Sequence, residues 1–156
     1  MRYFLLFFVL VFTACSVKNY EITQSKIIVI KSPKIKFADI GYVRNTQKSI
    51  EVELFSAGRV VDKITINHFV CTSKGCMGKS SFNKEYLSAS YPDDILQNII
   101  LGHKIYGGKN YLKTKEGFSQ YITDSDTDIK YVVTKHEIYF KDRYNGIMLK
   151  FKDIDE

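Results

Sequence analysis

Acidic residues alternate in one short segment, as Asp124, Asp126 and Asp128. This spacing matches the first ligands of a calcium-binding loop. Such a loop also needs a glycine at its sixth position and a glutamate at its twelfth, where this chain has Ile129 and Lys135. We therefore expect a solvated, negatively charged turn between two strands, and the sequence predicts neither a metal site nor a bound cofactor.

Side chains that could act in catalysis are present but are not arranged in a familiar motif. The chain contains no G-x-S-x-G, no H-E-x-x-H and no glycine-rich phosphate-binding loop. Its histidines, His68, His103 and His136, form no familiar spaced set of zinc ligands with the cysteines. Asp93 and Asp94 suit the N-terminal turn of a helix, so acid–base chemistry is not needed to explain them. We predict that the protein is not an enzyme.

The beginning of the chain has the composition of a targeting signal. Arg2 is basic, residues 5–12 are all apolar, and Thr-Ala precedes Cys15. This order resembles the lipobox of bacterial lipoproteins. The resemblance implies that a signal peptide, residues 1–14, is removed and that Cys15 is acylated and anchors the chain to the outer membrane, since Ser16 follows it and not aspartate. The alternatives are a secretory signal or an uncleaved helix, but a membrane span needs about 20 apolar residues.

If Cys15 carries lipid, Cys71 and Cys76 remain as a pair in an oxidising compartment. Their C-x4-C spacing excludes a redox CxxC motif, and zinc would need two further ligands. We expect a disulfide at the tip of a hairpin, with two free thiols as the alternative.

A mixed apolar and basic segment surrounds this pair. Met77 follows the second cysteine between Lys74 and Lys79, and we predict that these three side chains contact anionic lipid or a lipidated partner. The alternative is an ordinary solvated turn. The whole chain has a net charge of +6, but its lysines are scattered between apolar positions, so we expect no nucleic-acid partner.

Apolar residues alternate with polar ones on both sides of a central segment, which indicates strands. A polar tether, 15–25, precedes a single domain, 26–156. In the clearest alternation, residues 50–54, the aliphatic side chains face the core while Glu51 and Glu53 face water. Strands are predicted near 27–30, 35–37, 50–54, 60–70, 118–122, 129–133, 138–140 and 147–151. The fold is therefore α+β: a single curved antiparallel sheet of about eight strands with one main amphipathic helix across it.

That helix is predicted over residues 91–101. Ser90 can cap it, Pro92 is tolerated in its first turn, and Gly102 ends it. Its apolar stripe consists of Ile95, Leu96, Ile99 and Ile100, and such a stripe must be buried against a sheet.

The order of these elements resembles the LolA/LolB family of outer-membrane lipoprotein carriers and receptors. The positions that carry the resemblance are Pro92, Leu96, Gly102, Gln120, Tyr131, Ile147, Leu149 and Phe151. The resemblance implies a half-barrel-like sheet with helices as a lid, and a cavity for acyl chains.

An apolar ligand is also expected from the fold, since one short helix cannot fill the concave face of a curved sheet as completely as a second sheet would. Apolar pockets bind such ligands mainly by burial. We predict a cleft for an acyl chain or lipoprotein cargo, lined by Ile95, Leu96, Ile99, Ile100, Phe118, Tyr131 and Leu149. The alternative is a structural or protein-interaction lipoprotein with a fully packed core.

Overall fold

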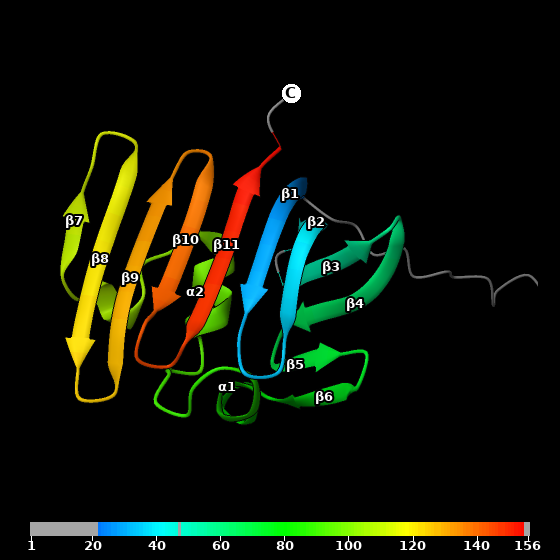
Figure 1. The fold of residues 1–156 in the computed structure, drawn as a ribbon, viewed down its shortest axis with the longest axis horizontal. Coiled ribbons are helices and arrows are strands. Elements are labelled where there is room, and N and C mark those ends of the chain that lie inside the picture. Colours follow the sequence, from blue (N-terminus) through cyan, green and yellow to red (C-terminus); the bar gives the residue numbers. More distant parts are fainter. Residues whose placement is uncertain (1–21, 47, 155–156) are drawn as a thin grey trace, which may run out of the picture.

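A computed structural model describes residues 22–46 and 48–154. In this part of the chain, eleven strands form one open, curved antiparallel sheet (Figure 1). The strands are β1 (Ile22–Lys31), β2 (Lys36–Asn45), β3 (Ile50–Ser56), β4 (Arg59–Ile66), β5 (Phe69–Thr72), β6 (Gly75–Gly78), β7 (Tyr111–Lys113), β8 (Gly117–Asp124), β9 (Thr127–Thr134), β10 (Glu137–Asp142) and β11 (Ile147–Asp153).

Two meanders meet at the centre of this sheet. The strand order is β6-β5-β4-β3-β2-β1-β11-β10-β9-β8-β7, so every pair of neighbours is consecutive in the chain except β1 and β11. These two pair antiparallel, from Lys26 opposite Asp153 to Lys31 opposite Met148. In Figure 1 the blue β1 and the red β11 accordingly lie side by side. The first and the last described strands thus join the two halves of the sheet.

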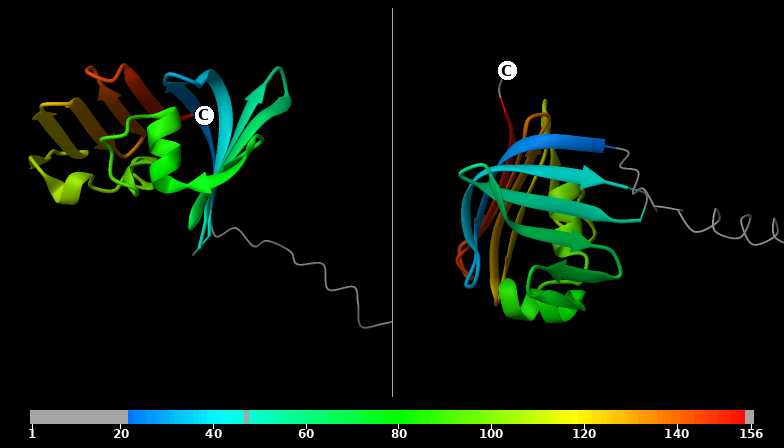
Figure 2. Two further views of the ribbon diagram at one scale, coloured as in Figure 1. Left: turned by 90° about the horizontal axis from the view of Figure 1, so that it is seen from below. Right: turned by 90° about the vertical axis from the view of Figure 1, so that its right-hand side faces the viewer.

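A helical connection between the meanders covers the concave face of the sheet. It contains α1 (Lys79–Tyr86), α2 (Ile95–Leu101) and the short 3-10 helix η2 (Tyr106–Gly108). Figure 2 shows the sheet curving around this connection. Phe82 and Tyr86 of α1 stack with ring centroids 4.7 Å apart, and both are buried. The hydrophobic core lies between this helical layer and the sheet.

Alternation along the strands explains which face is buried. In β11, for example, Ile147, Leu149 and Phe151 are buried while the residues between them are partly exposed. Successive side chains of a strand point to opposite faces, so one apolar row reaches the core. Burial of such rows contributes roughly 25 cal/mol per Å² of apolar surface.

The expectation that Glu51 faces water is wrong. Its side chain is only 1% exposed, because Arg44 of β2 and Lys63 of β4 cover it with ion pairs of 3.3 and 2.8 Å. Glu53 is also partly covered and shares both cations. The carboxylates lie on the face opposite the core, as their alternation predicts, but cations of the two neighbouring strands bury Glu51.

The described sheet has more strands than the eight predicted. The segment expected as one strand over 60–70 is divided into β4 and β5, and β6 completes a cysteine hairpin that pairs with β5. Strand β7 has only three residues, all exposed, and so lacks any alternation of burial. Strand β1 begins at Ile22, which places residues 22–25 of the expected tether inside the sheet.

Helix α2 begins at Ile95, so the predicted start at Tyr91 is wrong. Residues 91–94 form a bend and a turn, and the Ser90 hydroxyl lies 2.9 Å from that of Ser88 and does not cap the helix. Gly102 does end it, with φ 66° and ψ 28°, a left-handed conformation that glycine adopts without steric cost.

Candidate functional site

The apolar stripe of α2 faces the concave side of the sheet, as predicted. Ile95 and Ile99 are fully buried, and Leu96 and Ile100 are each 6% exposed. We call the apolar layer between the two helices and the sheet the seam. Four of the seven predicted ligand-binding residues are therefore the side chains with which α2 packs on the core.

A small cavity lies within the seam. Only apolar side chains line it: Ile30, Ile35, Val52, Ile64, Phe82, Leu87, Leu96, Ile100, Leu149 and Phe151. Leu96, Ile100 and Leu149 are the predicted ligand residues among them. The cavity has a volume of about 20 Å³, which is comparable to the space for one water molecule. An acyl chain could enter only if the helices moved away from the sheet.

The remaining predicted residues, Phe118 and Tyr131, lie near the C-terminal end of α2. Tyr131 is fully buried, and its hydroxyl donates to the carbonyl of His103 at 2.9 Å. Burial raises the pKa of this hydroxyl, so it stays a neutral donor. Phe118 is partly exposed and packs edge-on against Tyr131, with ring centroids 5.7 Å apart. These aromatic residues hold the end of α2 on β8 and β9.

Gln120 fixes the chain that leaves α2. It is fully buried, its Oε1 accepts from the Ile105 amide at 2.9 Å, and its Nε2 donates to the Ile105 carbonyl at 3.0 Å and to the Lys109 carbonyl at 2.7 Å. The backbone amide and carbonyl of the buried Ile105, which lies outside the sheet, are thereby satisfied. The predicted strand over 118–122 places Gln120 on β8, but the sequence does not predict this role.

A buried carboxylate holds the segment before α2. Asp142, at the end of β10, is fully buried and accepts hydrogen bonds from the Tyr91 hydroxyl at 2.6 Å and from Asn145 Nδ2 at 2.7 Å. Its other oxygen accepts from the backbone amides of Asp128, Tyr144 and Asn145. Burial would raise the pKa of Asp142, but these bonds outweigh it and hold the pKa below its ordinary value.

The cysteine hairpin agrees with the prediction. Cys71 of β5 and Cys76 of β6 lie opposite each other at disulfide distance, with Cα atoms 3.9 Å apart. Met77, however, lies opposite Val70, is partly buried and packs against the core, so it is not presented at the hairpin tip. Lys74 is exposed at the tip, whereas Lys79 begins α1. The three residues thus lie in a turn, a strand and a helix, and their contact with lipid or a partner stays a prediction.

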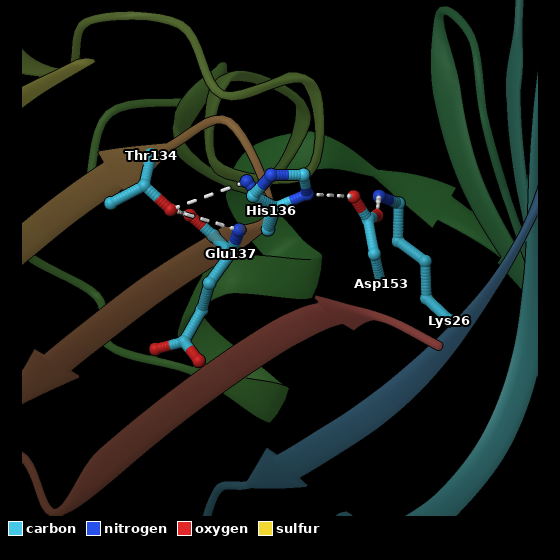
Figure 3. Close-up of polar contacts among 5 residues, drawn as sticks. All are labelled: Lys26, Thr134, His136, Glu137 and Asp153. Atoms are coloured by element: carbon cyan, nitrogen blue, oxygen red, sulfur yellow. Dashed lines mark hydrogen bonds and ion pairs between the residues drawn. The ribbon is translucent and has the colours of Figure 1, made fainter. Parts of the chain in front are cut away.

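A histidine and an aspartate lie together where β10, β11 and β1 meet (Figure 3). His136 Nδ1 is 3.3 Å from Asp153 Oδ2, and Lys26 Nζ is 2.6 Å from Asp153 Oδ1. The hydrogen bond from Lys26 lowers the pKa of Asp153. The nearby Thr134 hydroxyl is bonded to the backbone of its own turn, at His136 and Glu137, and not to the imidazole. This cluster therefore joins strand ends and lacks the geometry of an activated nucleophile.

The acidic turn has cationic partners. Asp124 pairs with Lys109 at 3.2 Å, and Asp128 pairs with Arg143 at 2.7 Å. Within the described residues, no group of three or more histidine, cysteine or acidic side chains is placed to hold a metal ion. The same part of the chain has no helix that is long and apolar enough to cross a membrane. Cys15 lies outside the described residues.

Comparisons with known proteins identify no relative: no protein family, curated protein or solved structure matches this chain.

Proposed function

We propose that this protein is a lipid-anchored envelope lipoprotein that binds an acyl chain, free or carried by a lipoprotein, in the seam between α2 and the concave face of the sheet. The observation that supports this proposal is the cavity in the seam, which only apolar side chains line. Apolar walls favour a ligand that binds by burial and needs few polar contacts.

The size of the helices explains how such a seam could open. Helices α1 and α2 have eight and seven residues. Isolated helices shorter than about 12 residues are marginal in water, so both depend on packing against the sheet. An acyl chain that replaced these contacts would displace the helices without exposing the concave face to water.

The architecture gives a second line of support. An open, curved antiparallel sheet with helices on its concave face is the arrangement that the resemblance to the LolA/LolB family implies. The outer membrane, with the domain on its periplasmic face, is part of the same proposal.

Ligand binding is tested with a fluorescent fatty acid titrated into the chain that starts at Ser16. We expect saturable binding, and we expect Leu96→Asp to abolish it because a carboxylate would enter the apolar seam. Val60→Asp on the exposed side of β4 is the matched control, since Val60 is 52% exposed. Circular dichroism must show that both variants are folded. If the folded wild-type protein does not bind, the seam has no ligand role.

The anchor is tested separately. Cys15→Ser should move the protein out of the membrane fraction, and mass spectrometry of the wild-type protein should find a diacylglyceryl adduct on Cys15. Identical partitioning of both proteins, with no adduct, would show that the lipoprotein assignment is incorrect.

A second candidate is an interaction or structural lipoprotein whose core never opens. The closed state of the seam favours it, together with the exposed apolar side chains Val60, Val61 and Phe69, which are 52–56% exposed. Under this proposal no fatty acid binds. The double variant Val60→Ser, Val61→Ser then weakens the association of the protein with its partner and leaves its free energy of unfolding unchanged.

A further inference from the structure

A groove with a volume of about 1060 Å³ lies at one end of the seam. The turn between β2 and β3, the turn between β4 and β5, and both helices form its walls. Its lining includes the polar or charged side chains of Lys48, His68, Lys79 and Gln97 and the apolar side chains of Phe69 and Leu101. We call it the mouth groove.

The polar wall of the mouth groove is cationic. Lys48 and Lys79 contribute ammonium groups, His68 contributes an imidazole, and no aspartate or glutamate is among the described residues that line it. Over residues 22–46 and 48–154, neither lysine has a carboxylate partner within ion-pair distance. Lys79 Nζ instead donates to Gln97 Oε1 at 2.9 Å, which holds the ammonium group at the groove wall. Such a surface attracts an anion.

The apolar floor of the mouth groove continues into the seam. Ile50 and Ile66 line the groove and lie directly opposite each other on β3 and β4. The pair two residues further along the same face, Val52 and Ile64, lines the seam cavity. The floor of the groove therefore adjoins the seam cavity at this end of the sheet.

The groove also lies close to the start of the described chain. Asn45 lines it and pairs with Ile22, the first residue of β1. Six residues, 16–21, lie between Cys15 and Ile22, so the two positions are seven residue steps apart. A chain spans at most about 3.5 Å per residue, so the lipid anchor of the proposed function is within about 25 Å of Ile22. This position brings the groove near the surface of the membrane that would supply a lipid.

We propose that the mouth groove binds the anionic headgroup, a carboxylate or a phosphate, of an amphiphile whose acyl chain enters the seam. This inference rests on the proposed function and adds to it the charge of the ligand and its orientation. The headgroup contacts Lys48, Lys79 and His68, and the first part of the acyl chain contacts Phe69 and Leu101. The apolar end lies between α2 and the sheet.

The test uses the full chain in phosphatidylcholine nanodiscs and two photoreactive probes, a fatty acid and its uncharged methyl ester. The measured quantity is the concentration of each probe that half-saturates cross-linking to the protein. The groove variant carries Lys48→Gln and Lys79→Gln. A matched control carries Lys115→Gln and Lys135→Gln, which remove the same charge from exposed positions outside the groove.

We expect the groove variant to bind the fatty acid about tenfold more weakly, because two charged contacts are lost, and to bind the ester as the wild type does. The control should match the wild type for both probes. If the groove variant retains the wild-type ratio of fatty-acid affinity to ester affinity, the mouth groove does not bind the headgroup. The proposal that the seam binds an acyl chain is then unaffected. If the wild type cross-links neither probe, both proposals fail. Inorganic phosphate should not displace the fatty acid at equal concentration; if it does, the groove binds free anions and the inference is overturned.

Discussion

The Tyr91 hydroxyl donates a hydrogen bond of 2.6 Å to Asp142, and both side chains are buried. This contact joins the segment before α2 to the end of β10, a strand of the meander that follows the helices in the chain. Burial and the neighbouring carboxylate raise the pKa of Tyr91, so the phenol stays a donor throughout the ordinary pH range. The position of the helical layer over the sheet thus depends on a polar contact as well as on apolar packing.

Tyr91→Phe should lower the free energy of unfolding by about 1.5–3 kcal/mol, the usual contribution of a hydrogen bond to a charged group. Urea denaturation followed by circular dichroism measures this change. Tyr144→Phe is the matched control, because Tyr144 is 65% exposed and should change stability by less than about 0.5 kcal/mol. Equal stability of Tyr91→Phe and wild type would contradict the role of this bond.

The Asp142 carboxylate should make stability dependent on acid pH. Its pKa in the folded protein lies below the ordinary value of 3.8. Its contribution is therefore complete above the unfolded-state pKa and is lost as the pH falls through the lower folded-state pKa. Urea midpoints measured from pH 7 down to about pH 2 should fall more steeply for wild type than for Asp142→Asn. Parallel curves would show that Asp142 does not titrate in this way.

Gln120→Met keeps the approximate size of the side chain and removes its three hydrogen bonds. The buried amide and carbonyl of Ile105 then lose their partners, which costs about 1–3 kcal/mol for each unsatisfied group. We expect lower stability and faster hydrogen exchange at the Ile105 amide. Gln120→Glu retains the acceptor but loses both donors, so it should protect that amide better than Gln120→Met does. Unchanged exchange in both variants would rule out this role.

Reduction of the Cys71–Cys76 disulfide should have a small effect, because it closes a loop of only six residues. The chain-entropy relation gives about 2 kcal/mol for such a loop. Cys71→Ser combined with Cys76→Ser should therefore leave the protein folded. Faster amide hydrogen exchange should be confined to β5 and β6. Intact mass should increase by about 2 Da on reduction, since two hydrogens are added. Complete alkylation without a reductant would contradict the disulfide.

The sequence predicted the elements in which apolar residues alternate over several positions. Strands β8 to β11 follow that pattern, and Asn145-Gly146 precedes β11, where Gly146 has φ 65°. Strand β7 is too short for any period to be detected, and the hairpin β5–β6 is indicated by its two cysteines and not by alternation. The burial of Glu51 was missed because its cations, Arg44 and Lys63, come from two other strands, and strand pairing alone brings them together.

The candidate site was predictable only in part, for a similar reason. The stripe of α2 follows from helical spacing, but the mouth groove combines two turns with both helices, and no local pattern connects Lys48 with Lys79. Asp142 did have a local signal, since an aspartate before a turn often accepts backbone amides two or three residues later. Its bond to Tyr91 has no such signal, because 51 residues separate the two.

The pairing of β1 with β11 has a consequence for folding. Lys26 and Asp153, opposite each other in the sheet, are 127 residues apart. Each meander consists of contacts between consecutive strands, which need only short loop closures, whereas this central pairing requires closure of nearly the whole described chain. We expect the two meanders to form first and to join last. Until residues 147–153 have been synthesised, β1 presents an unpaired edge, so the incomplete chain is exposed to aggregation at the middle of its sheet.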